Sequence, residues 1–179
     1  MTMLIIIILL AAVVGIIYEF NKFITLKNKV KQSKSTIEVY LNQRFDLIPN
    51  LVECVKGYMA HEQETFAKIA AMRAEYSSEK NKDLKKGAAL NEECNRIMAV
   101  GEDNPDLKAN EQFSNLQKNL TKIESQLQAA RRIYNADVTL YNTAIEVFPS
   151  NIFAIIFNFR KIELFEVEEY KKENVNIDI

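Results

Sequence analysis

The sequence predicts an all-α protein in which an N-terminal transmembrane helix is continuous with an antiparallel bundle of three to four long helices. Three observations predict this fold. The 179 residues include only four Gly and three Pro, too few breakers for an all-β chain with its many turns. Residues 1–18 carry no charged side chain. Apolar residues then recur every three or four positions over long stretches, which is the period of one helix face.

The apolar segment at residues 1–18 is long enough to cross a bilayer, although it lies at the short end of the usual range. Its Leu, Ile and Val side chains together favour insertion by about 5 kcal/mol. A cleaved signal peptide is the alternative, but no basic residue precedes the apolar run and residues 16–20 form a poor cleavage site. We therefore expect an uncleaved anchor. Its membrane-facing residues are Leu4, Ile5, Ile6, Ile7, Ile8, Leu9, Leu10, Val13, Val14, Ile16 and Ile17.

Basic residues follow this segment and predict its orientation. Residues 19–35 hold one acid, Glu19, and five lysines: Lys22, Lys27, Lys29, Lys31 and Lys34. The positive-inside rule then places the N-terminus outside and the remaining ~160 residues in the cytoplasm, on the inner or plasma membrane. We expect the lysines to reach toward lipid headgroups as a collar. A dedicated lipid-binding site is the alternative.

The breakers divide the rest of the chain into expected helices. No Gly or Pro lies between Gly15 and Pro49, so the membrane helix is expected to continue to about Arg44. Asp46 is the expected N-cap of a second helix over about 47–76, with Pro49 in its first turn. A polar loop over 77–86 and a shorter helix over about 88–100 follow.

The second half of the chain predicts one long helix. Residues 101–105 form a turn cluster, and the helix is expected over about 106–147, with three coiled-coil-like heptads of apolar residues. Ser150 is the expected cap of a short apolar helix over 151–159. The sequence thus divides into an anchor at 1–18, a helical bundle at 19–160 and a charged, irregular tail at 161–179.

Catalytic and metal-binding patterns are incomplete in this sequence. His61 and Glu62 begin a zinc-protease signature, but position 65, where the second His belongs, is Thr65. The chain has a single His, scattered glycines and two widely spaced cysteines, Cys54 and Cys94, which we expect to be small apolar core residues. We expect no enzyme activity, no cofactor and no metal. A net charge of −1 also argues against a general nucleic-acid-binding surface.

Polar residues inside the expected helices form the candidate functional set. Tyr134-Asn135 recurs as Tyr141-Asn142 seven residues later, which places both pairs on one helix face. The set either fixes the register of the bundle or faces a partner in a groove. Its members are Arg44, Asp46, Glu62, Arg73, Arg131, Tyr134, Asn135, Tyr141 and Asn142.

The segment 152–159 is apolar on nearly all sides and reads IFAIIFNF. Eight residues cannot span a membrane. The segment could close the end of the bundle, or dock on the bilayer surface or on a neighbouring protomer. The candidate oligomer or membrane contacts are Phe153, Ile156 and Phe157.

Several segments, taken in order, resemble the LemA family along nearly the whole chain. They are RFDLIPNLV (44–52), VKGY (55–58) with His61-Glu62, AMR (71–73), LKAN (107–110), ARRIYN (130–135), and Tyr141-Asn142 with Phe148-Pro149. Cys54 departs from the Thr that the family commonly carries there. The resemblance implies a bacterial protein with one N-terminal membrane helix and a cytoplasmic antiparallel helical domain. The resemblance implies no established activity, cofactor or catalytic residue. The genes of family members can neighbour those of membrane proteases.

Two functions remain open on this reading. The first is a non-enzymatic, membrane-anchored scaffold or adaptor that binds an unidentified protein partner, such as a membrane protease system, with or without forming a homo-oligomer. The second is a self-assembling structural protein that organises or shapes the bilayer. They differ in what the protein holds, either another protein or itself and the lipid.

Overall fold

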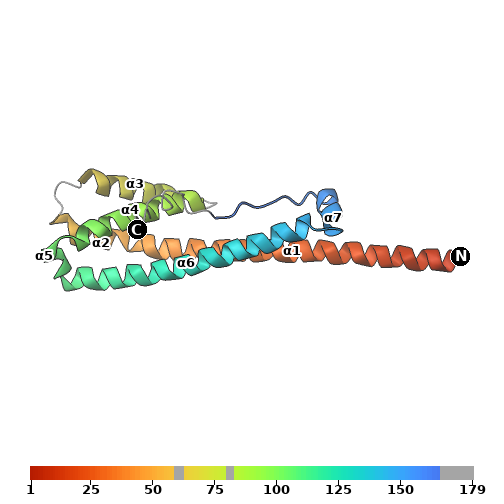
Figure 1. Ribbon diagram of the computed structural model, residues 1–179. Helices are drawn as coiled ribbons and strands as arrows, with labels where there is room; N and C mark the ends of the chain where they lie inside the picture. The colour runs from red at the N-terminus through yellow and green to blue at the C-terminus, as the bar shows by residue number, and fades with distance from the viewer. Residues whose placement is uncertain (59–62, 80–82, 166–179) are drawn as a thin grey trace, which may run out of the picture. The chain divides into compact units, whose positions relative to one another are not determined.

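The computed structural model describes residues 1–58, 63–79 and 83–165. These residues form helices and no strand, which confirms the predicted fold class. The helices, labelled in Figure 1, are α1 (Thr2–Asp46), α2 (Ile48–Lys56), α3 (Gln63–Ser78), α4 (Leu84–Glu102), α5 (Pro105–Lys108), α6 (Glu111–Glu146) and α7 (Ser150–Ile156).

The chain divides into two compact units, and α1 and α6 contribute residues to both. Unit 1 contains Met1–Lys31 and Ile133–Ile179, and therefore α7 and the described part of the tail. Unit 2 contains Gln32–Arg132, and therefore α2 to α5. Each unit has its own buried apolar residues, such as Phe23 and Val138 in unit 1.

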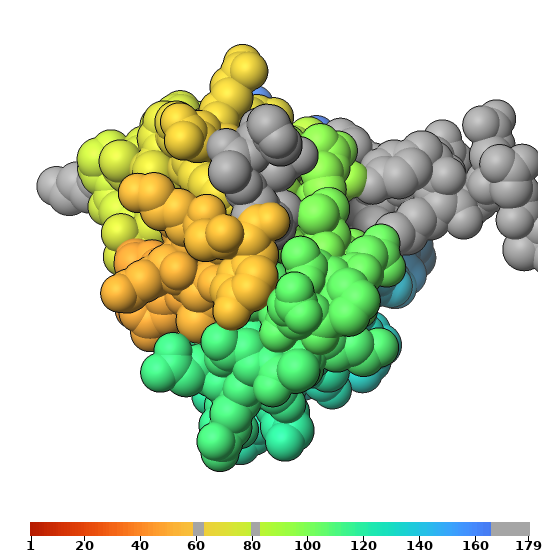
Figure 2. All heavy atoms as spheres, turned by 90° about the vertical axis from the view of Figure 1, so that its left-hand side faces the viewer, coloured from red at the N-terminus to blue at the C-terminus, as the bar shows by residue number. Residues whose placement is uncertain are grey.

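Unit 2 is a helical bundle built on the C-terminal part of α1. Its buried side chains include Ile37, Leu41, Leu51, Leu90 and Leu127. Within this unit α6 runs antiparallel to α1 (Figure 1), as the sequence predicts. In Figure 2, α2 (orange), α5 (green) and the start of α6 (teal) lie at the surface of one end of this unit.

Two glycines of α4 allow close packing inside unit 2. A Cβ atom at Gly87 would lie 2.7 Å from Leu41 Cδ1, and one at Gly101 would lie 2.6 Å from Phe113 Cζ. Both distances are shorter than carbon atoms tolerate, so a larger residue at either position would require the Leu41 or the Phe113 side chain to shift. The few glycines of this helix therefore serve packing rather than turns.

The second expected helix is interrupted, and its expected cap is wrong. Asp46 is the last residue of α1, and α2 begins after Leu47 without a side-chain cap, with Pro49 in its first turn as expected. The helical stretch ends at Lys56, followed by a turn at Gly57, where glycine is a poor helix former. Residues 59–62 lie outside the described part of the chain, and α3 follows them.

Asparagine and aspartate caps set the other boundaries of unit 2. α4 starts four residues before the predicted helix because the Asp83 side chain accepts a hydrogen bond from Lys85 N (2.8 Å). The predicted helix over 106–147 is divided into α5 and α6. Asn104 caps α5, and Asn110 caps α6 by accepting from Gln112 N (2.9 Å). The sequence predicted a single helix because Asn110, the second capping asparagine, did not stand out as a helix boundary.

Ser150 does not cap the last helix as expected. It is the first residue of α7 and is buried, and its hydroxyl donates to the carbonyls of Ala144 (2.8 Å) and Val147 (2.9 Å). Ser150 therefore fastens the start of α7 to the end of α6. α7 ends at Ile156, and residues 159–165 are described without regular secondary structure.

The two cysteines are free but differ in exposure, Cys94 being buried and Cys54 partly exposed. Burial raises the pKa of the Cys94 thiol to about 11, so the thiol stays protonated near neutral pH. Only the thiolate is nucleophilic.

A thiolate-selective reagent at about pH 8 should therefore modify Cys54 and spare Cys94 in the folded protein. Counting modified thiols by mass spectrometry checks this, and denaturant should expose both. A Cys54→Ser variant should lose the fast reaction. Equal reaction rates of the two thiols in the folded chain would contradict the buried placement of Cys94.

Candidate functional site

Among the described residues, nothing covers the apolar segment of α1. All of its large apolar side chains from Leu4 to Tyr18 are exposed, by 37% to 67%. Within the described residues, α1 is the helix long and apolar enough to cross a membrane. So much exposed apolar surface is unfavourable in water and needs an apolar surrounding.

The lysines after this segment lie on α1, spread along the helix. Lys22 pairs with Glu19 (3.2 Å) and Lys34 with Glu38 (3.7 Å), while Lys27 Nζ lies 5.9 Å from the ring centre of Phe159. Lys29 and Lys31 are exposed.

Two asparagines of α6 hold the described part of the tail. Asn142 donates through Nδ2 to Ile162 O (2.8 Å) and accepts through Oδ1 from Ile162 N (3.0 Å). Asn135 makes the same pair of bonds with Phe165, at 2.9 and 2.7 Å. Each side-chain amide thus bonds one residue as a neighbouring β-strand would, through both its N–H and its C=O.

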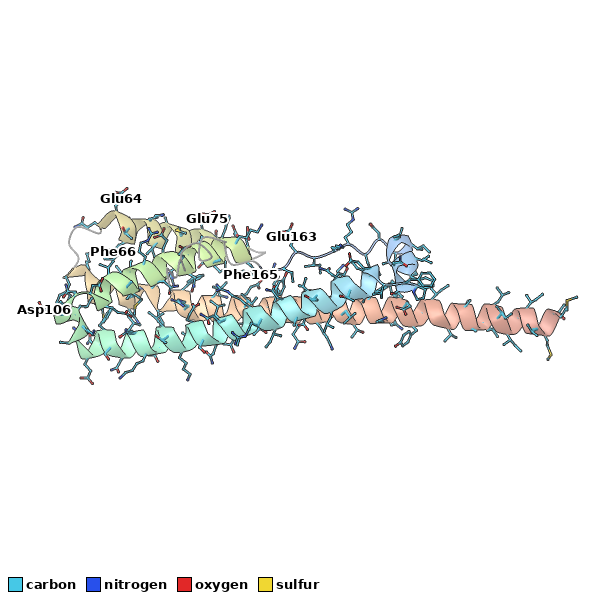
Figure 3. All side chains as sticks on the ribbon, viewed as in Figure 1. Glu64, Phe66, Glu75, Asp106, Glu163 and Phe165 are labelled. Carbon is cyan, nitrogen blue, oxygen red and sulfur yellow. The ribbon has the colours of Figure 1, made fainter. Side chains whose placement is uncertain are left out.

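The tyrosine beside each asparagine adds one more bond to the tail. Tyr141 Oη donates to Arg160 O (3.0 Å), and Tyr134 Oη donates to Glu163 O (3.3 Å). Burial raises the pKa of both phenols, so each hydroxyl keeps its proton as a donor. Figure 3 labels Glu163 and Phe165 on this extended segment. We call Tyr134, Asn135, Tyr141 and Asn142 the tail clamp.

The spacing of the tail clamp matches the rise of an extended chain. Seven residues of helix rise about 10.5 Å, and three residues of an extended strand span about 10 Å. Asn142 and Asn135 are seven apart, and the residues they hold, Ile162 and Phe165, are three apart. The tail therefore runs antiparallel to α6, and all six bonds end on main-chain atoms.

A second polar cluster lies inside unit 2 around Arg44, which is only 2% exposed. Its guanidinium donates to the Glu124 carboxylate and to Asn95 Oδ1. Glu124 also accepts from Asn91 Nδ2 (3.2 Å) and lies 4.0 Å from Arg131 Nη1. The cluster therefore ties α1, α4 and α6 together.

This cluster places two guanidinium groups against one carboxylate. Burial lowers the pKa of Arg131, an effect that the charge of Glu124 opposes. Among the described residues, Arg44 Nε has no hydrogen-bond partner. A buried charge without its partner is strongly unfavourable, so Glu124 is the residue on which this cluster depends.

Arg73 and Asp46 meet at the C-terminal end of α1. Arg73 Nε donates to the Phe45 carbonyl (2.9 Å), and its Nη2 lies 3.5 Å from Asp46 Oδ1. A cation at the C-terminus of a helix interacts favourably with its free carbonyls and dipole. Glu62, the other expected polar residue nearby in sequence, and His61 lie outside the described residues.

The residues that follow α7 contact α1 through aromatic rings. The Phe157 ring lies 5.0 Å from that of Phe20, and Phe159 lies 5.0 Å from Phe23. Of the three expected contact residues on this segment, Phe153 is partly exposed, Ile156 is 66% exposed, and Phe157 packs on Phe20.

The sequence reasoning missed residues in both regions. Asn91 and Asn95 belong to the Arg44 cluster. Their signal in the sequence was an asparagine directly after each of two apolar residues of one helix face, Leu90 and Cys94. Phe148 and Ile155 are the most exposed large apolar side chains around α7, at 80% and 79%. Their exposure depends on how α7 folds back and could not be read from composition.

The structure therefore brings four of the expected polar residues together in the tail clamp, pairs Arg73 with Asp46, and places Arg44 with Arg131 around Glu124. Within the described ranges, no three His, Cys, Asp or Glu side chains lie close enough to hold a metal ion.

The LemA family model matches residues 33–179, and the chain therefore belongs to the LemA family. It is similar to the magnetosome protein MamQ of Magnetospirillum gryphiswaldense, with 23% identity over 88% of this chain and 68% of the relative. It is also similar to protein LemA of Metamycoplasma hominis, with 22% identity over 87% of this chain and 73% of the relative. The family match begins after the apolar segment of α1 and includes the tail clamp.

Replacing both clamp asparagines by alanine should free the tail. The Asn135→Ala/Asn142→Ala variant loses two bonds at each held residue, worth about 1–3 kcal/mol per asparagine. Hydrogen exchange at the amides of Ile162 and Phe165 should accelerate about 10-fold or more.

Thr139→Ala is the matched control, because among the described residues this α6 hydroxyl donates to its own helix at Asn135 O (2.8 Å) and to no atom of the tail. It should leave exchange in the tail unchanged. Slow exchange at both amides in the double variant would show that the tail is not held by the asparagines.

Removing Glu124 should destabilise the protein strongly. Glu124→Ala leaves Arg44 buried without its carboxylate, at a cost of about 3–5 kcal/mol. Thermal unfolding of the detergent-solubilised chain, followed by circular dichroism, measures this. Arg44→Leu/Glu124→Leu should recover part of the loss, and a double variant no more stable than Glu124→Ala would refute the charge-pair explanation.

Proposed function

We propose that this protein is a non-enzymatic, membrane-anchored helical scaffold or adaptor that binds a protein partner at the cytoplasmic face of the membrane. The observation that carries the proposal is the unbroken α1, whose exposed apolar segment continues into a helix that supplies core residues to both units. Without a break, a helix transmits the position of its anchor more rigidly than a flexible linker.

Orientation is part of the same proposal. The lysines from Lys22 to Lys34 follow the apolar segment on the side of the helical units. By the positive-inside rule this supports a single-pass protein of the inner or plasma membrane, with its N-terminus outside and its helical units in the cytoplasm. The incomplete zinc signature and scattered glycines of the sequence support a role without catalysis or cofactor, and the net charge of −1 supports a role without nucleic acid.

The tail clamp supports the adaptor part of the proposal. Its bonds end on main-chain atoms, so it could hold an extended segment of another protein, such as a membrane protease, in the same way. The chain's own tail competes, because an attached segment has an effective concentration in the millimolar range. A partner must therefore supply further contacts beyond the clamp.

A self-assembling protein that shapes the membrane is the second candidate. The observation that favours it is the exposed apolar surface of α7, including Ile155 and Ile156, which copies of the chain could bury against one another. This candidate predicts a homo-oligomer without a second protein.

The test compares the full-length chain, the Asn135→Ala/Asn142→Ala variant and Thr139→Ala after extraction in mild detergent. We expect native mass measurement to give a complex larger than one chain, and mass spectrometry to identify a second protein in it. The double variant should retain at least ~10-fold less of that protein than Thr139→Ala, because it loses four main-chain bonds.

Each other result counts against a defined part of the proposal. Equal recovery of the partner in all three chains would remove the tail clamp from the binding site. A large complex containing this chain alone would favour the self-assembling protein. A metal or nucleotide recovered at one per chain would contradict a non-enzymatic role.

A further inference from the structure

The exposed apolar residues around α7 form one surface. Ile152, Ile155 and Ile156 follow helical spacing on one face, while Ser150 and Ala154 lie on the opposite, buried face. Phe148 precedes them in the turn that leads into the helix. We call Phe148, Ile152, Ile155 and Ile156 the α7 face. Among the described residues, nothing covers it, and its exposures range from 49% to 80%.

Aromatic contacts fix the level of α7 along α1, within unit 1. Phe157, the residue after α7, packs on Phe20, at 5.0 Å between ring centres, and Phe159 lies 6.0 Å from the same ring. Phe20 follows Tyr18, the end of the uncharged segment, by about 3 Å of helix rise. In Figure 1, α7 lies beside α1. The α7 face is therefore at the depth where the apolar segment of α1 ends.

The charges near this level are those of a membrane interface. Lys22 and Lys27 lie on α1 next to the aromatic contacts, and Lys27 Nζ is over the Phe159 ring at 5.9 Å. Arg160 and Lys161 follow on the tail. Two acids near this level among the described residues, Glu19 and Glu146, each pair with a lysine, Lys22 and Lys161 respectively. Aromatic and basic side chains beside an apolar surface are typical of the boundary between acyl chains and headgroups.

We propose that α7 is an interfacial membrane helix, with the α7 face buried in the boundary layer of the leaflet from which α1 emerges. The occupant is lipid rather than a second copy, because the face lies at the level where the exposed apolar segment of α1 ends, beside the basic side chains of Lys22 and Lys27. This proposal rests on the proposed membrane anchor. An interfacial α7 would be the second attachment of unit 1 to the bilayer, after α1. Two attachments restrict the rotation of unit 1 about the axis of α1.

The absence of Trp from the sequence makes single-Trp reporters practical. Three isoleucines with similar exposure serve as sites: Ile8 in the apolar segment (59%), Ile155 on the α7 face (79%) and Ile133 on α6 (57%). Each would be replaced by Trp in the full-length chain, which is reconstituted into phospholipid vesicles that contain acyl-brominated lipid. The readout is quenching of Trp fluorescence by bromine at defined depths.

We expect strong quenching of Ile8→Trp and Ile155→Trp, with Ile155→Trp quenched most by bromine near the headgroup end of the acyl chain. Ile133→Trp should not be quenched, because it lies about 20 Å along α6 from that helix's C-terminal end. Ile152→Trp is a second reporter on the α7 face and should behave as Ile155→Trp.

The failures of the two proposals are distinguishable. If Ile8→Trp is not quenched, the membrane anchor itself is wrong. If Ile8→Trp is quenched while both α7 reporters match Ile133→Trp, the anchor stands and the interfacial helix is refuted. Blue-shifted but unquenched α7 reporters, with a shift that grows with the ratio of protein to lipid, would assign the α7 face to a second copy and also overturn the proposal.

Discussion

The uninterrupted hydrogen-bonded backbone of α1 is the constraint on which the other features depend. No Gly or Pro lies between Gly15 and Pro49, so nothing in the sequence ends the helix where the apolar segment meets the charged one. The same helix therefore carries the exposed apolar residues, the rings that fix α7 in unit 1, and Arg44 in the core of unit 2. A flexible junction would leave these features without a common element.

The Arg44 cluster and the tail clamp use polar groups for different purposes. Around Arg44 one charge is buried and the charges of Glu124 and Arg131 are largely covered, so each needs its partner because an unpaired buried charge is strongly unfavourable. That requirement selects one register among α1, α4 and α6 more sharply than apolar contacts, which tolerate substitution and small shifts. The tail clamp is neutral and its two asparagines are partly exposed, so their bonds are weaker and can open locally without loss of the core.

The sequence predicted the helices from their apolar period, and the long unbroken α1 was the clearest case. The apolar period did not predict the short interruptions between helices. α2 ends at Lys56 because the next residue, Gly57, is a poor helix former. Asn110 separates α5 from α6 because its side chain caps α6. Tyr134, Asn135, Tyr141 and Asn142 were recognised as one face, but their partners were not. Those partners are main-chain atoms of the tail, which carry no side-chain signature in a sequence.

The seven-residue repeat of the Tyr-Asn pair has a geometric reason. Seven residues of helix, about two turns, are nearly as long as three residues of extended chain. One repeat of the Tyr-Asn pair along α6 therefore advances by the same distance as three residues of the tail. Asparagine suits this position because its amide offers one donor and one acceptor side by side, whereas aspartate would place a second acceptor against a carbonyl. Asparagine side chains on one face of a helix can in this way bond an extended segment as the edge strand of a sheet would. The repeated pair therefore explains how a charged tail with no regular secondary structure of its own at residues 159–165 is held in one register.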